Sequence, residues 1–300
     1  MIRKVLIVGA GGNLGPSIVQ AFLSTPSSFE VSVLTRDARS KSFAGPVKVF
    51  ETDYSEESLL EAMSGQDAVV SAVGFRAVGQ QKKLIDVAIK AGVQRFIPSE
   101  FGGDSANPRS TELRPPVFQI KLDILDYLKE REKTGLTWSV LVTGPFFDWG
   151  LSSGFLGFDL KKREALIWDD GACRFSTTTL STVGQAVVKT LQHPDETANR
   201  FVYVASFTLS LNDILEALEK SSASRWKVVR TSGEDEIKAG QQSLRDGDLA
   251  SAIPRLVRAG WYTRGRGGNY GDERELDNAL LALPQENLDA VVSELLRPSA

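Results

Sequence analysis

The 300-residue sequence predicts an α/β fold, a doubly wound parallel sheet with a smaller, mainly helical C-terminal lobe. In the first half, short β-rich runs alternate with helical patterns, which is typical of βαβ units. Most of these runs are continuously apolar, as expected of strands that helices cover on both faces. The first run also leads through a glycine-rich turn directly into a helical pattern, so the sheet is predicted to be of the Rossmann type.

The expected strands and helices follow one another in order. The strand sequences are KVLIVGA, EVSVLTR, VKVFET, DAVVSAVG, QRFIPS and LTWSVLVTG, and helices are expected near residues 14–23, 58–63, 80–91 and 117–133. After Gly144, the segment GPFFDWGLSSGFLGFDLKKREALIW is rich in aromatic residues and glycine, and it predicts loops and a short hairpin. A helix, STVGQAVVKTLQ, and a strand, RFVYVA, come next, and amphipathic helices are expected in the remainder.

These segments predict two domains. A nucleotide-binding Rossmann domain is expected over residues 1–150 and 176–206, because the earlier βα pattern returns after the aromatic segment. Residues 151–175 and 207–300 are expected to form the smaller, substrate-binding lobe.

Composition excludes several classes of function. The formal charge of −3 does not suggest a nucleic-acid partner, and no apolar run is long enough to cross a bilayer. Cys173 is the only cysteine and His193 the only histidine, so neither an intrachain disulfide nor a Cys/His metal cluster can form. We expect a cytoplasmic protein, a monomer or homodimer, without a metal, and with His193 at the end of a helix before Pro194.

The sequence GAGGNLG joins the first strand to the first helix and places Gly9, Gly12 and Gly15 in a GxxGxxG spacing. A dinucleotide pyrophosphate requires such a turn, because the backbone must approach the phosphates and the helix N-terminus offers N–H groups to negative charge. Strand, turn, helix and second strand occur in the required order. We therefore predict a dinucleotide site that also includes Asn13 and Leu14.

The second strand ends at LTRDARSK, which bears on the choice of cofactor. Arg36 and Lys41 supply positive charge where a 2′-phosphate would lie, and a guanidinium can bind phosphate bidentately. NADP(H) is therefore favoured, with NAD(H) and an Asp37 that faces the ribose as the alternative.

Two further strand ends are expected at the cofactor. Asp53 either reaches the adenine amino group or caps the helix that begins near Ser55. The short side chains after the fourth strand are expected beneath the ribose and phosphates, and they are Ser71, Ala72, Val73 and Gly74.

Lys121 lies in the middle of the apolar stripe of VFQIKLDILDYL. We expect Ile124, Leu125 and Leu128 to pack on the sheet and Lys121 to face the cofactor cleft. A tyrosine followed four positions later by lysine, the usual short-chain dehydrogenase pair, is absent, which makes Lys121 a candidate proton donor or acceptor. The alternative is a lysine that extends across apolar neighbours and releases its amine to water.

Four segments, GAGGNLG, LTR, RFIPSEFGGD and KLDIL, resemble the isoflavone reductase and phenylcoumaran benzylic ether reductase group of atypical short-chain dehydrogenases, near the NmrA-like proteins. The similarity covers residues 1–205 and is most specific at RFIPSEFG and the lysine after it. It implies NADPH as hydride donor, Lys121 as general acid/base, Arg36 and Lys41 at the 2′-phosphate, and Ser99 to Phe101 beside the nicotinamide. Plant members also use a C-terminal histidine, which this sequence lacks.

The resemblance implies an NADPH-dependent reductase of an aromatic or conjugated small molecule in secondary metabolism. Candidates for the substrate wall, whose alternative role is ordinary core between the lobes, are Phe101, Phe146, Phe147, Trp149 and Phe155. Two alternatives are a non-catalytic NADP(H)-sensing regulator and a non-redox isomerase that uses bound nucleotide. A serine hydrolase, suggested by GxSxG at residues 150–154, is disfavoured because no strand leads directly into that motif.

Overall fold

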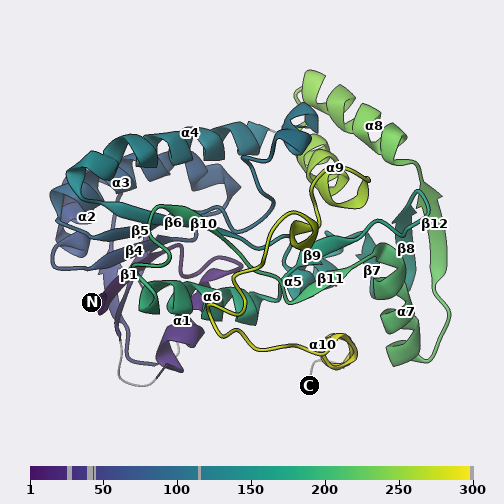
Figure 1. The fold of residues 1–300 in the computed structure, drawn as a ribbon, viewed down its shortest axis with the longest axis horizontal. Helices are drawn as coiled ribbons and strands as arrows, with labels where there is room; N and C mark the ends of the chain where they lie inside the picture. The colour runs from purple at the N-terminus through teal and green to yellow at the C-terminus, as the bar shows by residue number, and fades with distance from the viewer. Residues whose placement is uncertain (26–28, 39–42, 44, 114–115, 298–300) are drawn as a thin grey trace.

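The structure, a computed structural model, describes residues 1–25, 29–38, 43, 45–113 and 116–297. Within these residues, seven parallel strands form one sheet in the order β3-β2-β1-β4-β5-β6-β10 (Figure 1). Their bounds are β1 Lys4–Val8, β2 Glu30–Thr35, β3 Lys48–Glu51, β4 Ala68–Ser71, β5 Arg95–Ile97, β6 Thr137–Val142 and β10 Arg200–Tyr203. Strand order reverses between β1 and β4, and the predicted Rossmann-type sheet is confirmed.

Helices cover both faces of this sheet. One face carries α1 (Gly15–Leu23) and α6 (Leu180–Gln192); the other carries α2 (Glu56–Met63), α3 (Gln81–Lys90) and α4 (Pro116–Arg131) (Figure 1). As predicted, Ile124, Leu125 and Leu128 of α4 are buried against the sheet. Among the residues described, no helix combines the length and apolar character that a membrane span needs.

The second lobe lies beyond the carboxyl ends of the strands and combines short sheets with helices (Figure 1). Strands β7 and β8 form the expected hairpin, β12 extends it, and β9 pairs with β11. The elements are α5 Phe147–Ser152, β7 Phe158–Asp159, β8 Glu164–Trp168, β9 Phe175–Thr177, β11 Phe207–Leu209, α7 Leu211–Ser222, β12 Lys227–Thr231, α8 Gly233–Arg245, α9 Leu249–Tyr262 and α10 Leu288–Leu295.

Two elements of this lobe differ from the sequence prediction. The short helix α5 occupies a segment expected to be loop, and it contains Gly150, where a Cβ would lie 2.7 Å from Leu156 Cγ. Close tertiary packing therefore fixes a helix that local propensity does not favour. Strand β12 was missed because four of its five residues are exposed, so its sequence shows no alternation of apolar and polar residues.

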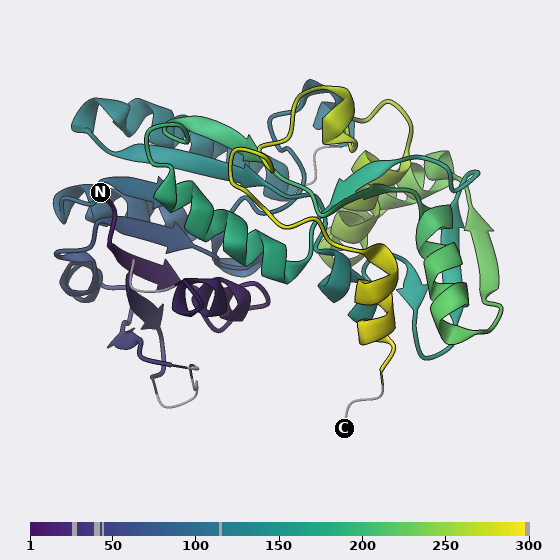
Figure 2. The ribbon, with the colours of Figure 1, turned by 60° about the horizontal axis from the view of Figure 1, so that its bottom comes forward.

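The segment between α9 and α10 returns to the β10 edge of the seven-stranded sheet before it enters α10 (Figure 2). The Asp277 carboxylate accepts the Tyr203 N–H at 2.8 Å, and the Asn278 amide bonds both the N–H and the carbonyl oxygen of Ala205. Leu281 is buried in the core beside α1 and α6. The C-terminal segment thus packs on the sheet at β10 before it enters α10.

Candidate functional site

The glycine turn between β1 and α1 has no room for a side chain at Gly9 or Gly15. Gly9 has a φ of +87°, and a Cβ there would lie 2.5 Å from the Ala72 carbonyl oxygen. A Cβ on Gly15 would lie 2.4 Å from the carbonyl group of Ala10. The Gly12 N–H donates to the Gly9 carbonyl oxygen at 3.0 Å, so the turn folds tightly over the start of α1. Only glycine permits this approach of backbone to backbone.

Two cavities adjoin this turn at the carboxyl ends of the strands. One has a volume of about 710 Å³ and the other about 400 Å³. Both are lined by Gly12, Ala72, Val73 and Gly74, so the predicted residues after β4 lie between them. The cavities meet where strand order reverses, the position at which doubly wound sheets bind ligands.

Arg36 and Tyr54 line the larger cavity, where β2 and β3 end. The Arg36 side chain is exposed, and its charge acts on the half-buried Tyr54 phenol. Burial raises the pKa of Tyr54, which outweighs the lowering by Arg36 and keeps the phenol neutral. Tyr54 was not predicted, although it follows Asp53 directly at a strand end. Lys41 lies outside the described residues.

Asp53 and Ser71 are not among the residues that line either cavity. Asp53 Oδ1 accepts hydrogen bonds from the Ser55 N–H at 2.8 Å and the Ser58 hydroxyl at 2.9 Å. The Ser55 hydroxyl first, and then these two hydrogen bonds, lower the pKa of Asp53 to about 2. The N-cap of α2 is Ser55, so Asp53 bonds to residues at the start of the helix and does not cap it; its contact with adenine stays a prediction. Ser71 is fully buried beneath the turn.

Lys121 lines the smaller cavity, which also contains Asn13 and Leu14 of the glycine turn. Its side chain is half-buried, and Nζ donates a hydrogen bond to the carbonyl oxygen of Glu100. The structure thus brings the lysine of α4 to the same cavity as the glycine turn, which is the orientation expected for a lysine that faces a cofactor cleft.

The smaller cavity is also lined by three residues that follow β5: Ser99, Glu100 and Phe101. The Ser99 hydroxyl donates to the Val73 carbonyl oxygen at 2.7 Å and joins this turn to the end of β4. Phe101 has a φ of +26°, a conformation that bulky residues rarely adopt. Strained backbone of this kind concentrates at functional sites, where surrounding contacts hold it.

Aromatic side chains continue from the smaller cavity into the second lobe. Phe146 lines the cavity, and its ring centroid lies 6.4 Å from that of Trp149. Phe155 follows at 5.4 Å from Trp149, and Trp261 of α9 at 6.2 Å from Phe155. Trp261 was not predicted, because nothing in its local sequence connects α9 to this region.

Phe147 does not lie among the aromatic side chains that continue from the smaller cavity, and its predicted contact with the substrate is wrong. Its side chain is fully buried in the core of the second lobe, with its ring 5.2 Å from Phe207. As the first residue of α5, it packs inward while its neighbour Phe146 lines the cavity.

The GxSxG motif does not form a nucleophile elbow. Ser152 ends α5, and its hydroxyl donates to the Asp148 carbonyl oxygen at 2.8 Å. His193 ends α6, as predicted, with Nδ1 3.7 Å from Glu196. The hydrolase hypothesis therefore lacks its strand-to-helix turn.

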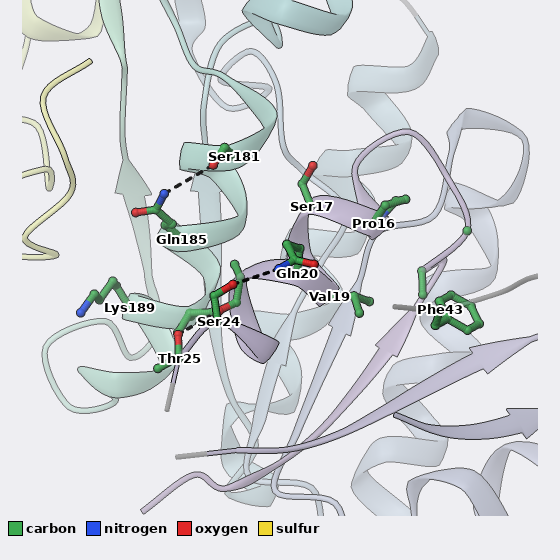
Figure 3. Close-up of a pocket in the computed structure, with 14 residues that line it drawn as sticks. Pro16, Ser17, Val19, Gln20, Ser24, Thr25, Phe43, Ser181, Gln185 and Lys189 are labelled. Carbon is green, nitrogen blue, oxygen red and sulfur yellow. Dashed lines mark hydrogen bonds between the residues drawn. The ribbon is translucent and has the colours of Figure 1, made fainter. Parts of the chain in front are cut away.

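A further cavity of about 770 Å³ lies between α1 and α6, as Figure 3 shows. Two pairs of its polar side chains are hydrogen-bonded to each other: Gln20 donates to Ser24 at 3.0 Å and Gln185 to Ser181 at 3.5 Å. This cavity lies on the face of the sheet that α1 and α6 cover, and Lys121 does not line it.

Comparisons with known proteins agree with this geometry. A model of the NmrA-like family matches residues 1–240. Oxidoreductase aprR of Aspergillus flavus is 40% identical over 299 residues, which cover 99% of this chain and 100% of that protein. Phenylcoumaran benzylic ether reductase Betv6 of Betula pendula is 27% identical over 259 residues, 80% of this chain and 81% of that protein. A solved structure described as AtPrR2 with NADP+ and (+)pinoresinol shares the fold, with a TM-score of 0.77 at 23% identity over 98% of this chain and 99% of that one.

Proposed function

This chain belongs to the NmrA-like family and is an oxidoreductase, and we propose that it is an NADPH-dependent reductase of an aromatic or conjugated small molecule in secondary metabolism. The observation that carries the proposal is the cavity that contains both the Lys121 amine and the glycine turn. A proton-transferring group thus lies beside the expected dinucleotide site.

The residues of the turn fit a dinucleotide. Gly9 and Gly15 lie where a Cβ would collide with the backbone of Ala72 and Ala10, so the turn has no side chain at these two positions. The N-terminus of α1 adjoins the same turn. In this proposal Arg36 and Lys41 bind the 2′-phosphate, and the backbone of Ala72 to Gly74 supports the ribose and phosphates. When bound by these residues, NADPH would supply a hydride to the substrate.

Lys121 supplies the proton that accompanies the hydride. A substrate carbon that accepts hydride leaves negative charge on a conjugated atom, and the ammonium donates a proton to that atom. The Glu100 carbonyl oxygen holds the amine in one place, which favours a near-attack geometry. Phe146, Trp149 and Phe155 offer flat apolar surface to an aromatic substrate.

The test combines nucleotide binding with turnover. NADPH and NADH affinities are measured by fluorescence titration, and NADPH oxidation is followed with a panel of aromatic and conjugated candidates. We expect Lys121→Met to lower kcat by about 100-fold or more while NADPH binding is retained. Lys129→Met changes an exposed lysine on the same helix and should keep full activity.

Three outcomes would contradict the proposal. Retained kcat in Lys121→Met would remove the catalytic assignment. Tight NADPH binding without turnover of any candidate would favour the sensing regulator. Product formation without net NADPH oxidation would favour the isomerase.

A further inference from the structure

Tyr54 is an aromatic residue of the larger cavity to which the proposed mechanism gives no role. It lines that cavity beside Leu34 and Arg36, where β2 and β3 end. Lys121 lines the smaller cavity, and the residues shared by the two cavities belong to the glycine turn and to the end of β4. A dinucleotide with its nicotinamide beside Lys121 and its pyrophosphate at the turn therefore extends its adenosine half toward Tyr54.

The backbone of Tyr54 adopts a conformation that its residue type disfavours. Its φ is +64°, in the left-handed region that glycine and asparagine occupy far more readily than a bulky residue does. It lies in the short connection between β3 and α2, where either of those residues would fit the main chain better. Strained residues of this kind concentrate at ligand sites. The contacts of the side chain, rather than the needs of the main chain, therefore account for a tyrosine here.

Both backbone polar groups of Tyr54 are bonded, so the strained conformation is held in place. Its N–H donates to Thr52 Oγ1 at 2.9 Å, and Thr52 is itself buried and bonded to the Thr35 carbonyl oxygen at the end of β2. Its carbonyl oxygen accepts a hydrogen bond from the Lys83 ammonium, which reaches it from α3. The corner after β3 is thus tied to a neighbouring strand and to a helix.

The phenol ring is supported on the protein side and open in part to the cavity. Tyr54 is half-buried and packs against the apolar core that contains Leu34 and Ala77, which line the same cavity. A flat ring held in this way suits a flat base, because every base offers a π-face to an aromatic side chain. The geometry therefore favours adenine at this end of the larger cavity.

We propose that Tyr54 binds the adenine ring of the nucleotide by stacking, and that Lys83 is the positioning residue that holds Tyr54 at the cavity. The inference rests on the proposed function for the identity of the nucleotide and adds a contact which that function does not contain. Arg36 is assigned to the 2′-phosphate, whereas Tyr54 acts on the base. The two contacts can therefore be measured separately.

The experiment measures binding and requires no turnover. Affinities of the full chain for NADPH, NADH and 2′,5′-ADP are measured by isothermal titration calorimetry. In Tyr54→Leu we expect all three nucleotides to bind about tenfold more weakly, because each contains adenine and the stacking surface is lost. The ratio of NADPH to NADH affinity should stay at its wild-type value, since both nucleotides lose the same contact. Tyr54→Phe keeps the ring and should bind all three as the wild type does.

Three results would overturn the role of Tyr54. One is wild-type affinity for 2′,5′-ADP in Tyr54→Leu. Another is a loss in Tyr54→Phe as large as that in Tyr54→Leu, since the hydroxyl rather than the ring face would then carry the contact. The third is a loss in Tyr54→Leu that is confined to NADPH, which would place the effect at the 2′-phosphate.

Lys83→Met tests the positioning role, and it carries the whole test if Tyr54→Leu fails to fold by near-UV circular dichroism, because Lys83 is exposed. We expect it to weaken NADPH and NADH by the same factor, severalfold, and to reduce the fall in adenine absorbance when 2′,5′-ADP binds at saturation. Lys82→Met is the matched control, since this exposed lysine of the same helix lies instead over the Tyr127 ring, 5.3 Å from its centre.

Wild-type binding in Lys83→Met would overturn the positioning role, and so would a loss for NADPH alone, which would indicate a charge that acts on the 2′-phosphate. Equal losses in Lys82→Met and Lys83→Met would do the same. Failure of these tests leaves NADPH turnover and its dependence on Lys121 untouched. It is therefore distinct from failure of the proposed function, which retained turnover in Lys121→Met would show.

Discussion

Gly9→Ala tests whether the glycine turn is as tightly packed as the geometry indicates. The new methyl group would lie 2.5 Å from the Ala72 carbonyl oxygen, 2.8 Å from its carbonyl carbon and 3.1 Å from the Val73 nitrogen. All three neighbours are backbone atoms, and the Ala72 N–H is itself bonded to the Val8 carbonyl oxygen at 2.8 Å. The clash can be relieved only if the end of β4 moves away from β1.

The expected loss of stability is about 1 to 5 kcal/mol. A left-handed conformation costs alanine about 1–2 kcal/mol, overpacking costs about 1–3 kcal/mol, and the smaller entropy of the unfolded alanine chain returns about 0.4–1 kcal/mol. Urea unfolding measures the difference through the midpoint at constant m value. Gly79→Ala is the matched control, because no atom lies within 4 Å of a Cβ there and the residue is exposed. Equal unfolding midpoints for the two variants would refute the reasoning.

Three further predictions use other parts of the site and the fold. Arg36→Ala should weaken NADPH binding about tenfold or more and leave NADH binding nearly unchanged, as fluorescence titration would show; equal losses for both nucleotides would contradict a 2′-phosphate contact. Glu286→Ala should lower the unfolding free energy by about 1–3 kcal/mol in urea, because Oε2 accepts the hydroxyls of Thr179, Thr182 and Ser206, and a wild-type midpoint would contradict this. Burial raises the pKa of Glu100 in the folded protein above the ordinary value of 4.5, which we assign to the unfolded chain. At a pH between the unfolded and the folded pKa, the folded state binds more protons than the unfolded state, so the wild type loses stability as the pH rises through that range. Relative to the wild type, Glu100→Gln should therefore gain stability as the pH rises above 4.5, and a difference that does not vary with pH would contradict the prediction.

The sequence predicted those parts of the fold and the site that depend on short-range patterns. The βα alternation and the GxxGxxG spacing were sufficient for the sheet, because a strand, a turn and a helix in succession leave few arrangements open. Lys121 is a candidate because it interrupts an apolar stripe, of which Ile124, Leu125 and Leu128 pack on the sheet. The resemblance to the isoflavone reductase group is confirmed by the family model and by the relatives.

Residues that depend on contacts distant in sequence could not be predicted. Trp261 meets Phe155 through the docking of α9, which no local pattern records. Phe146 and Phe147 are adjacent and chemically identical, yet one lines the cavity and the other is core. That difference arises because α5 begins between them, and α5 itself is fixed by packing against Leu156. Asp53 had two plausible partners, and local hydroxyl and N–H groups bind its carboxylate.

The segment between α9 and α10 links the candidate site to the C-terminal part of the chain. The Tyr270 hydroxyl donates to the Gly102 carbonyl oxygen, in the turn whose Glu100 carbonyl oxygen binds Lys121. The Tyr270 N–H donates to the Ser176 hydroxyl of β9 at 3.1 Å, so Tyr270 also bonds to the second lobe. A few residues later, Asp277 binds the backbone of β10. A displacement of this segment would therefore expose the buried Glu100 carboxyl group to water and remove the cause of its raised pKa. The environment of Lys121 is thus set by residues from both halves of the sequence, although the lysine and the turn that binds it lie in the first.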